Sequence, residues 1–343
     1  MKTPCLYLCA EDVRRALPMR AAIVAMREAF VQLSSGQAML PPRQHIPSPG
    51  QHGVALAMVC HSAAQNLFSL KFITLFEQNP AKGLPLIHSL VILTDGTTGE
   101  HLAVMDGAAL TAVRTGAGSG VATDLLARDD ATVAAVFGAG VQGRTQLEAV
   151  RCARPIRKAY VYDADAAAAD RFAVEMSRQL GFAVERAKDP AAAIKDADVI
   201  CTATTASSPV FEDRDLKAGV HINAIGSYRP DVTEIPPETV CRARVVVDHR
   251  ASALAEAGDL LVPLKRGMIE ESHMQVEVGE ILLGKASGRG GGDEITLFKS
   301  VGVAIQDLCA ADCALQNARR LGLGTPMAEV AATEDKSRSR ETT

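Results

Sequence analysis

The chain has 343 residues, of which 48% are hydrophobic, and its 36 basic and 40 acidic residues leave a net charge of only −4. This length and apolar content suffice for two domains, each with its own core. The balanced charge, the absence of Trp and the 4% aromatic content argue against a nucleic-acid surface or an anionic membrane as partner. A small molecule is the expected ligand.

Targeting and metal-binding signals are also missing from the sequence. Glu11 and Asp12 interrupt any apolar core of a signal peptide, and no apolar run approaches the length of a membrane span, so a cytoplasmic protein is expected. The eight cysteines form no CxxC pair, and the eight histidines show no HExxH spacing. We therefore predict free thiols and no metal site.

The first hundred residues have the pattern of an α+β unit. Residues 11–33 are expected to form a helix with one apolar face, and the Pro- and Gly-rich segment 39–53, which carries Arg43, is expected to be a loop. Alternating apolar runs then predict a mainly antiparallel sheet, and Lys71 lies within the second of them. The predicted strands are 54–60, 68–75 and 86–94.

Residues 105–119 form a small-residue stretch of helical character that contains Arg114. A helix of Gly, Ala and Ser packs closely against its neighbours, so an arginine on it is expected to point at something specific. The alternative is that Arg43 and Arg114 are solvated or paired with Asp106 or Asp124. Lys71, in the same way, has an alternative as a charged residue that protects an edge strand.

A glycine-rich turn follows the apolar run 131–137 and precedes a helical pattern. Gly138 suits a tight turn, Gly140 lets the backbone approach a phosphate, and Gly143 allows close packing of helix on strand. The helix N-terminus adds free N–H groups and a partial positive charge. This arrangement predicts a site for the pyrophosphate of a dinucleotide.

Strands and helices alternate from residue 131 onward, which predicts a Rossmann-type, doubly wound parallel sheet of about six strands. Ligands of such folds bind beyond the carboxyl ends of the strands, so Thr202 and the run from Ile225 to Ser227 are expected to border the cofactor crevice. Residues 285–292 are expected to be a flexible connection, and a helix over 300–321 to return to the first domain. The predicted strands are 132–137, 158–162, 182–185, 198–202, 221–225 and 244–248.

Several stretches together resemble the ornithine cyclodeaminase/mu-crystallin family over about residues 10–322. They include Leu110-Thr-Ala-Val-Arg-Thr115, the glycine turn, Ile222-Asn-Ala-Ile-Gly-Ser227, Ala255-Glu-Ala-Gly-Asp259 and Phe298-Lys-Ser-Val-Gly302. The resemblance implies a homodimer. It also implies a discontinuous substrate-binding and dimerisation domain, residues 1–122 and 305–330, around a Rossmann domain, residues 123–304. Residues 331–343 are expected to be a disordered tail.

The resemblance also implies a site for a substrate α-carboxylate, held by Arg43, Lys71 and Arg114, with Ser227 as a further substrate contact. An arginine fork matches a carboxylate bidentately, and Lys71 is the expected catalytic residue, which orients the substrate and is a candidate proton donor. Asp231 is an alternative acid, or a helix cap. The expected cofactor contacts are Arg114, Thr115, Gly138, Gly140, Val141, Gln142, Gly143, Asp163, Thr202 and Gly226.

One departure from the family pattern favours a particular reaction. Cyclodeaminases carry an aspartate soon after the glycine that corresponds to Gly226, and here Tyr228 stands at that position. Without this base, cyclodeamination is disfavoured. Reduction of a preformed C=N bond does not need such a base. We therefore expect an NAD(P)H-dependent imino-acid (ketimine) reductase that acts on Δ1-pyrroline-2-carboxylate and Δ1-piperideine-2-carboxylate.

The alternatives are an alanine dehydrogenase or open-chain imine reductase, an ornithine cyclodeaminase, and a non-catalytic crystallin-like binding protein. Cofactor choice depends on Asp163, which ends the second strand of the Rossmann unit. A carboxylate there accepts hydrogen bonds from ribose hydroxyls and repels a 2′-phosphate. NAD(H) is therefore favoured, and NADP(H) remains possible.

Overall fold

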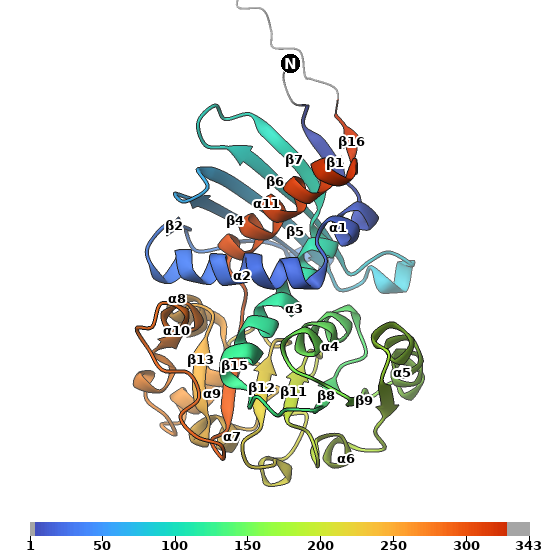
Figure 1. Cartoon of the computed structure of the whole chain (residues 1–343), viewed down its shortest axis with the longest axis vertical. Helices are drawn as coiled ribbons and strands as arrows, with labels where there is room; N and C mark the ends of the chain where they lie inside the picture. Colours follow the sequence, from blue (N-terminus) through green and yellow to red (C-terminus); the bar gives the residue numbers. More distant parts are fainter. Residues whose placement is uncertain (1–3, 328–343) are drawn as a thin grey trace, which may run out of the picture.

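The computed structural model describes residues 4–327, which form two stacked units (Figure 1). Both ends of the described chain build the upper unit, coloured blue and red, whereas the middle of the chain builds the lower one, coloured green to orange. The predicted combination of an α+β unit from both chain ends and a central doubly wound unit is thus confirmed.

The upper unit contains a mixed but mainly antiparallel sheet. Its order is β16-β1-β7-β6-β5-β4-β2, with β3 also paired to β4, and all neighbours except β1 and β7 run antiparallel. The strands are β1 (Leu6–Leu8), β2 (Ala38–Met39), β3 (Gln44–Ser48), β4 (Gly53–Ser62), β5 (Leu67–Phe76), β6 (Ile87–Asp95), β7 (His101–Asp106) and β16 (Thr325–Pro326).

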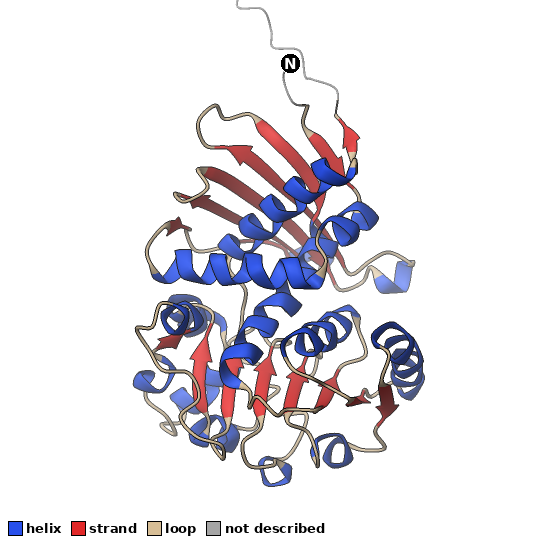
Figure 2. Ribbon diagram, viewed as in Figure 1, coloured by secondary structure: helices blue, strands red, loops and turns tan. Residues whose placement is uncertain are grey.

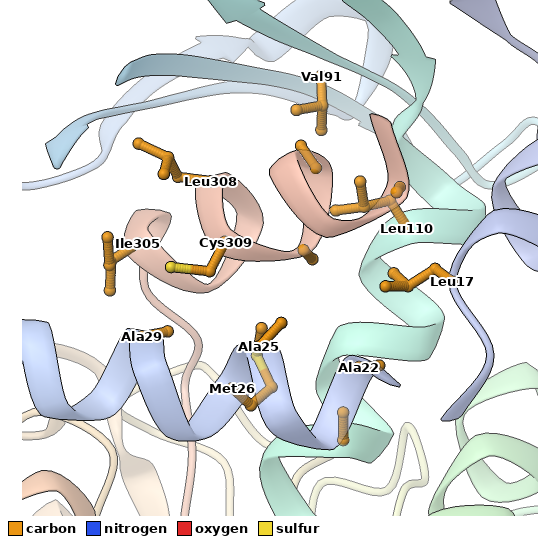
Figure 3. Packing of buried hydrophobic residues seen from close by; sticks show 14 of the residues in the cluster. Leu17, Ala22, Ala25, Met26, Ala29, Val91, Leu110, Ile305, Leu308 and Cys309 are labelled. Carbon is orange, nitrogen blue, oxygen red and sulfur yellow. The ribbon is translucent and has the colours of Figure 1, made fainter. Parts of the chain in front are cut away.

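Helices pack on one face of this sheet, and the apolar side chains between the sheet, α11 and α2 form a core (Figure 3). Leu308 points from α11 toward the sheet, while Cys309 on the same helix points toward α2. The apolar residues of α2 recur at helical spacing, and this face is buried as the sequence predicts. The helices are α1 (Ala10–Ala16), α2 (Met19–Ser34), α3 (Gly107–Leu126) and α11 (Ala304–Leu321).

The two faces of the sheet differ because side chains alternate along each strand. On β5, Leu67, Ser69 and Lys71 are buried, whereas Phe68 and Phe72 are exposed. Leu90 on β6 lies directly opposite Phe72 and is exposed as well. The outer face of the sheet therefore presents apolar side chains.

Three predictions for this unit were wrong in part. The helix expected over residues 11–33 is divided into α1 and α2, with Pro18 directly before α2. The segment 39–53 is not a plain loop, because Gln44–Ser48 forms β3; Pro47 is tolerated there because β3 pairs with β4 alone. The stretch 105–119 is not helical throughout, because the strand β7 continues to Asp106. The Asp106 carboxylate then accepts a hydrogen bond from Ala109 N at 2.7 Å and caps α3.

The lower unit contains a wholly parallel sheet of order β10-β9-β8-β11-β12-β15-β13-β14. The carboxyl ends of its strands point toward the upper unit (Figure 2). The strands are β8 (Val133–Phe137), β9 (Lys158–Tyr162), β10 (Ala183–Arg186), β11 (Val199–Thr202), β12 (His221–Ala224), β13 (Arg244–Val247), β14 (Val276–Glu277) and β15 (Thr296–Lys299). The helices are α4 (Val141–Ala153), α5 (Ala166–Leu180), α6 (Pro190–Ile194), α7 (Pro237–Arg242), α8 (Arg250–Glu256), α9 (Gly258–Lys265) and α10 (Val278–Leu282).

The sequence prediction of about six strands missed β14 and β15. β15 lies inside the sheet, between β12 and β13. It is only four residues long and ends in Lys299, a residue type that is rarely buried, so its pattern was weak. The helix predicted from residue 300 begins at Ala304, because residues 300–303 form the return connection.

The chain crosses between the units twice, once along α3 and once through residues 300–303. The proposed domain boundary at residues 122/123 falls inside α3, and the one at 304/305 falls at the start of α11. The predicted tail, residues 331–343, lies outside the described residues. Within residues 4–327, no helix is long and apolar enough to span a membrane.

Candidate active site

The glycine turn has the geometry that a pyrophosphate site requires. Gly138 has a φ of +99°, and a Cβ built there would lie 2.4 Å from the Ala203 carbonyl oxygen. At Gly143 a Cβ would lie 2.0 Å from the Gly138 oxygen, whereas at Gly140 it would meet no described protein atom within 4 Å. Gly140 precedes α4, so that open space lies at the helix N-terminus.

Two charged residues fix this turn. Asp163 accepts hydrogen bonds from Ala139 N at 2.7 Å and from Asp165 N at 2.9 Å, so it links the end of β9 to the turn. The Arg144 guanidinium donates to the carbonyls of Ala139 and Gly140. A carboxylate has about four acceptor positions, so Asp163 retains capacity for ribose hydroxyls.

A buried carboxylate organises the next rim of the crevice. Glu234 accepts hydrogen bonds from Thr202 Oγ1 at 3.1 Å, Thr204 N at 2.7 Å and Ser227 N at 3.1 Å. A Cβ at Gly226 would lie 2.4 Å from the Glu234 carboxylate. The loops after β11 and β12 are therefore held together beside the glycine turn, because Thr202 pairs with Phe137 and with Ala224 in the sheet.

A cavity of about 880 Å³ opens between the two units. Arg43 and His45 line it from the upper unit, Tyr228 from the loop after β12, Glu256 from the end of α8, and Gly302 from the return connection. Most of the remaining lining is apolar, including Leu40, Pro41, Pro42, Val54, Met58, Leu75, Val303 and Ala304. Such a mixture suits a small ligand with one charged group.

Lys71 and Arg114 lie behind the cavity wall and share one carboxylate. Lys71 Nζ is 2.7 Å from Asp307 Oδ2, and Arg114 Nε donates to Asp307 Oδ1 at 3.0 Å. Arg114 Nη1 donates to Gln306 Oε1 at 3.0 Å, which leaves Nη2 without a hydrogen bond within residues 4–327. Gly302 covers this guanidinium, since a Cβ there would lie 2.9 Å from Nη1.

The Lys71–Asp307 contact is not aligned as a hydrogen bond, and neither atom has another partner within residues 4–327. Lys71 is only 1% exposed, and its sheet neighbours Met58 and Val91 are apolar. Burial lowers the pKa of Lys71 to about 7, with Arg114 and Arg43 acting in the same direction and Asp307 opposing them. Its protonation therefore responds to any further negative charge in the site.

Arg43 is held by three acceptors. Its Nη2 donates to the carbonyls of Val301 at 3.0 Å and Gly302 at 2.6 Å, and its Nε lies 3.1 Å from Glu256 Oε1. The carbonyls are presented because Asp248 binds the amides of Val301 and Gly302. Only Nη1 of Arg43 has no partner within residues 4–327. A ligand carboxylate therefore cannot bind Nε and Nη2 together as a bidentate pair.

The alternatives for the three cations hold only in part, because Arg43 and Arg114 do form ion pairs, but with Glu256 and Asp307. Lys71 lies on an interior strand rather than at an edge. Asp106 caps α3 and Asp124 pairs with Arg27 and Arg154, so neither partners Arg43 or Arg114. Asp231 caps no helix, because it lies in an irregular segment and pairs with Arg229 at 3.0 Å.

The other predicted site residues are placed as follows. Ser227 is buried, its hydroxyl donates to Val232 O at 2.6 Å, and its predicted substrate contact stays a prediction. Thr115 follows Arg114 on α3 and is buried, whereas Val141 is exposed at the start of α4. Gln142 Oε1 is buried without a partner in the described chain. These positions surround the turn, and their cofactor contacts also stay predictions.

Sequence reasoning missed Asp307 and Glu256 as site residues. Asp307 lies on α11 among mostly small and apolar residues, but Asp312 follows on the same helix, so the pattern did not single out Asp307. Glu256 belongs to a stretch that carried the family resemblance, but nothing in its local pattern distinguished it from a surface carboxylate.

A second hollow, of about 750 Å³, lies beside Arg128, Arg154 and Arg289, away from this site. Its arginines are engaged with the protein itself: Arg289 donates to backbone carbonyls that include Leu126 O, and Arg154 pairs with Asp124. Arg289 thereby anchors the connection 285–292, which the sequence suggested was flexible. The first cavity is therefore the candidate active site, since Arg43 lines it and keeps one donor, Nη1, without a partner in the described chain.

Comparison with known proteins agrees with this geometry. The profile of the ornithine cyclodeaminase/mu-crystallin family matches residues 5–321. A Delta(1)-pyrroline-2-carboxylate reductase of Bacillus cereus is 36% identical over 320 residues, which cover 93% of this chain and 98% of that protein.

Solved structures show the same similarity. The Delta(1)-pyrroline-2-carboxylate reductase of Thermococcus litoralis, in complex with NADH and L-proline, has a TM-score of 0.90 at 40% identity, covering 94% of this chain and all (100%) of that one. An archaeal alanine dehydrogenase dimer with bound NAD has a TM-score of 0.88 at 33% identity, covering 94% of this chain and 99% of that one. The chain therefore belongs to the ornithine cyclodeaminase/mu-crystallin family.

Proposed function

We propose that this protein is an NAD(H)-dependent reductase of cyclic imino acids. Its substrates are Δ1-pyrroline-2-carboxylate and Δ1-piperideine-2-carboxylate, which it converts to L-proline and L-pipecolate. The relatives and neighbours described above support the oxidoreductase class and a C–N bond as the site of reaction. The cavity and the cations near it favour a substrate that is a ring with a carboxylate group.

The observation that carries the proposal is the cluster of Arg43, Lys71 and Arg114 around only two carboxylates, Asp307 and Glu256. With the three cations charged, the cluster has one positive charge in excess when both carboxylates are ionised, and two when Glu256 is protonated. Arg43 lines the cavity and keeps a free donor, Nη1. A substrate carboxylate would meet this donor and lower the excess positive charge, to which Lys71 and Arg114 contribute from behind the wall.

This charge balance discriminates among substrates. A dicarboxylate such as iminosuccinate would bring a second negative charge into a cavity whose remaining lining is largely apolar; its further charged residues are Glu77 and Arg229, and Arg229 is already paired with Asp231. Burying an uncompensated charge is costly, so a monocarboxylate is favoured. Tyr228 lines the cavity where a cyclodeaminase would present an aspartate, and burial raises the pKa of its hydroxyl, so it is a poor base.

The cofactor role of the lower unit rests on the glycine turn and on Asp163. NAD(H) supplies a hydride to the imine carbon when it is bound. The chain's own part is to hold the pyrophosphate at the N-terminus of α4 and to offer the Asp163 carboxylate to the ribose hydroxyls. Lys71 lies behind the cavity wall and acts on the substrate carboxylate through its positive charge, which helps to orient the imine carbon toward the crevice.

Oxidation of NADH and NADPH with a panel of substrates tests the proposal. The panel comprises both cyclic imino acids, iminosuccinate, and pyruvate with ammonia, and a separate assay with NAD+ follows the conversion of ornithine to proline. We expect turnover with the cyclic imino acids and a preference for NADH. Turnover of pyruvate with ammonia alone would indicate an alanine dehydrogenase, and conversion of ornithine to proline without imine reduction would indicate a cyclodeaminase. Either result would refute the proposal.

We also propose that the outer face of the upper sheet binds a second copy of this chain. Phe72 and Leu90 form an exposed cross-strand pair, with Phe68 on the same face of β5. Apolar side chains grouped on one sheet face are typical of an interface. The structural neighbour that is a dimer supports this choice of occupant. Sedimentation of the Phe72→Asp variant should give a monomer, whereas an unchanged dimer would place the interface elsewhere.

A further inference from the structure

Glu256 is a carboxylate of the cavity wall with one oxygen uncommitted. It ends α8, and its side chain is 18% exposed. Oε1 lies 3.1 Å from Arg43 Nε, whereas Oε2 is buried and has no hydrogen-bond partner within residues 4–327. An unpartnered buried oxygen on the wall of a ligand cavity marks a position where a donor or acceptor of the ligand fits.

The position of Arg43 indicates which ligand atom reaches Glu256. Because the Nε and Nη2 groups of Arg43 are occupied, a substrate carboxylate meets its Nη1. In a cyclic imino acid the nitrogen is bonded to the carbon that bears the carboxylate. The reacting nitrogen therefore lies next to the carboxylate and on the same wall as Glu256.

We propose that Glu256 is the catalytic acid that gives a proton to the substrate nitrogen during reduction. This inference rests on the proposed function. The O–H bond of the Glu256 carboxyl group breaks and an N–H bond forms, while the imine carbon receives a hydride from the reduced nicotinamide. The imine is reduced, the nicotinamide is oxidised, and Glu256 is left as a carboxylate.

The surroundings of Glu256 allow it to hold this proton and to regain it. Burial raises the pKa of its carboxyl group, Arg43 and His45 oppose this, and Asp248 adds to it. The half-exposed His45 ring lies 3.8 Å from Oε1 and connects the carboxyl group to solvent. The other charged or titratable side chains that line the cavity are Glu77, Tyr228, Arg229 and His249.

Two other candidates fit the role less well. Lys71 is 1% exposed, pairs with Asp307 and does not line the cavity, so it is not placed to give a proton to the substrate nitrogen. Asp231 is two-thirds exposed and paired with Arg229, which keeps the pKa of its carboxyl group below the usual value. A group that stays ionised in solvent is a poor acid near neutral pH.

Ligand binding to the enzyme–NADH complex tests the nitrogen contact separately from the carboxylate clamp. The probes are L-proline and cyclopentanecarboxylate, which share the ring and the carboxylate, and only proline carries the nitrogen. In the wild type we expect proline to bind about 10 to 100 times more tightly, which corresponds to one hydrogen bond to a charged group. In Glu256→Gln this preference should fall to a few-fold or less, while the Kd of cyclopentanecarboxylate stays within a few-fold of wild type.

Two further variants complete the test. Glu256→Asp keeps the charge but withdraws it by one methylene, so it should retain part of the preference and remain informative if the Gln variant is unstable. Asp231→Asn is the matched control and should bind both probes like wild type. In turnover, Glu256→Gln should lower kcat for imine reduction about 100-fold or more.

The outcomes separate the two proposals. An undiminished preference for proline in Glu256→Gln, or loss of the preference in Asp231→Asn, would overturn the role of Glu256 and leave the proposed function intact. Failure of the wild-type complex to bind either probe would instead contradict the proposed function itself.

Discussion

Two buried lysine–aspartate pairs with the same 2.7 Å separation, Lys71–Asp307 and Lys299–Asp259, lie in different units of the molecule. All four side chains are 0 to 1% exposed. Their surroundings differ. Lys299 also donates to Ser227 O, and Asp259 accepts from the amides of Glu234 and Ile235, whereas Lys71 Nζ has no further partner within residues 4–327.

The comparison separates a fully hydrogen-bonded pair from one that is not, and the second lies at the candidate site. In the Lys299–Asp259 pair, hydrogen bonds from neighbouring groups compensate the cost of burial and fix the loop that follows β12. In the Lys71–Asp307 pair the compensation is incomplete, and the pKa of Lys71 is lowered to about 7. A negatively charged substrate near Lys71 would offset the part of the burial cost that the protein itself does not compensate.

The largest effect is expected from removing a charge of the fully hydrogen-bonded pair. Lys299→Met would leave Asp259 buried without a cation, and we expect a loss of about 3 to 5 kcal/mol in the free energy of unfolding. Urea denaturation of the variant measures this loss. Lys71→Met is the matched control, because Asp307 keeps Arg114 there and the loss should be clearly smaller. Equal losses would remove the distinction between the two pairs.

The next largest effect is expected at Arg114. Arg114→Ala should lower kcat/KM for imine reduction tenfold or more, because it removes a positive charge near the substrate carboxylate and leaves Asp307 with Lys71 alone. Arg114→Lys keeps the charge but loses the planar group, so it should restore only part of the activity. Steady-state kinetics of both variants provide the check, and wild-type values for the alanine variant would reject the clamp.

A smaller effect follows from the pKa of Lys71. Because that pKa is lowered to about 7, Lys71 is charged below this pH and loses its charge as the pH rises through it. A bound carboxylate favours the charged form, so the affinity of the NADH complex for cyclopentanecarboxylate should fall above about pH 7, by up to about tenfold per unit. In Lys71→Met this fall should disappear. A flat profile for the wild type would contradict the assigned titration.

The smallest effect is expected at Asp163. Asp163→Ser removes the negative charge that disfavours a 2′-phosphate, so the preference for NADH over NADPH should decrease several-fold. The variant also weakens the link to Ala139 N, and kcat/KM measured with both cofactors separates the loss of affinity from the loss of discrimination. An unchanged ratio would exclude Asp163 from the ribose site.

The features that the sequence predicts well are those encoded locally. The glycine turn is read from seven adjacent residues, and its φ at Gly138 and close approach at Gly143 follow from them. Lys71 and Arg114 were found through a family resemblance whose motifs are short. Their exact partner was not found, because Asp307 lies 193 residues after Arg114, and no local pattern connects the two.

The strand β15 shows a second reason for failure. A four-residue strand is stabilised mostly by its neighbours β12 and β13, so its own sequence carries little information. Lys299 made the pattern still weaker, and the pairing that makes it acceptable involves Asp259, which lies 40 residues earlier. The position of Glu256 against Arg43 likewise depends on how the two units meet.

Helix α3 connects the candidate site to the glycine turn. Arg114 on this helix donates to Asp307, and two residues later Gly116 packs against α4, where an added Cβ would lie 2.5 Å from the Thr145 carbonyl oxygen. The position of Arg114 relative to α4, the helix that begins at the glycine turn, is therefore fixed by α3. Opening of the cavity by movement of the remaining sheet would change access to the substrate while leaving that spacing fixed.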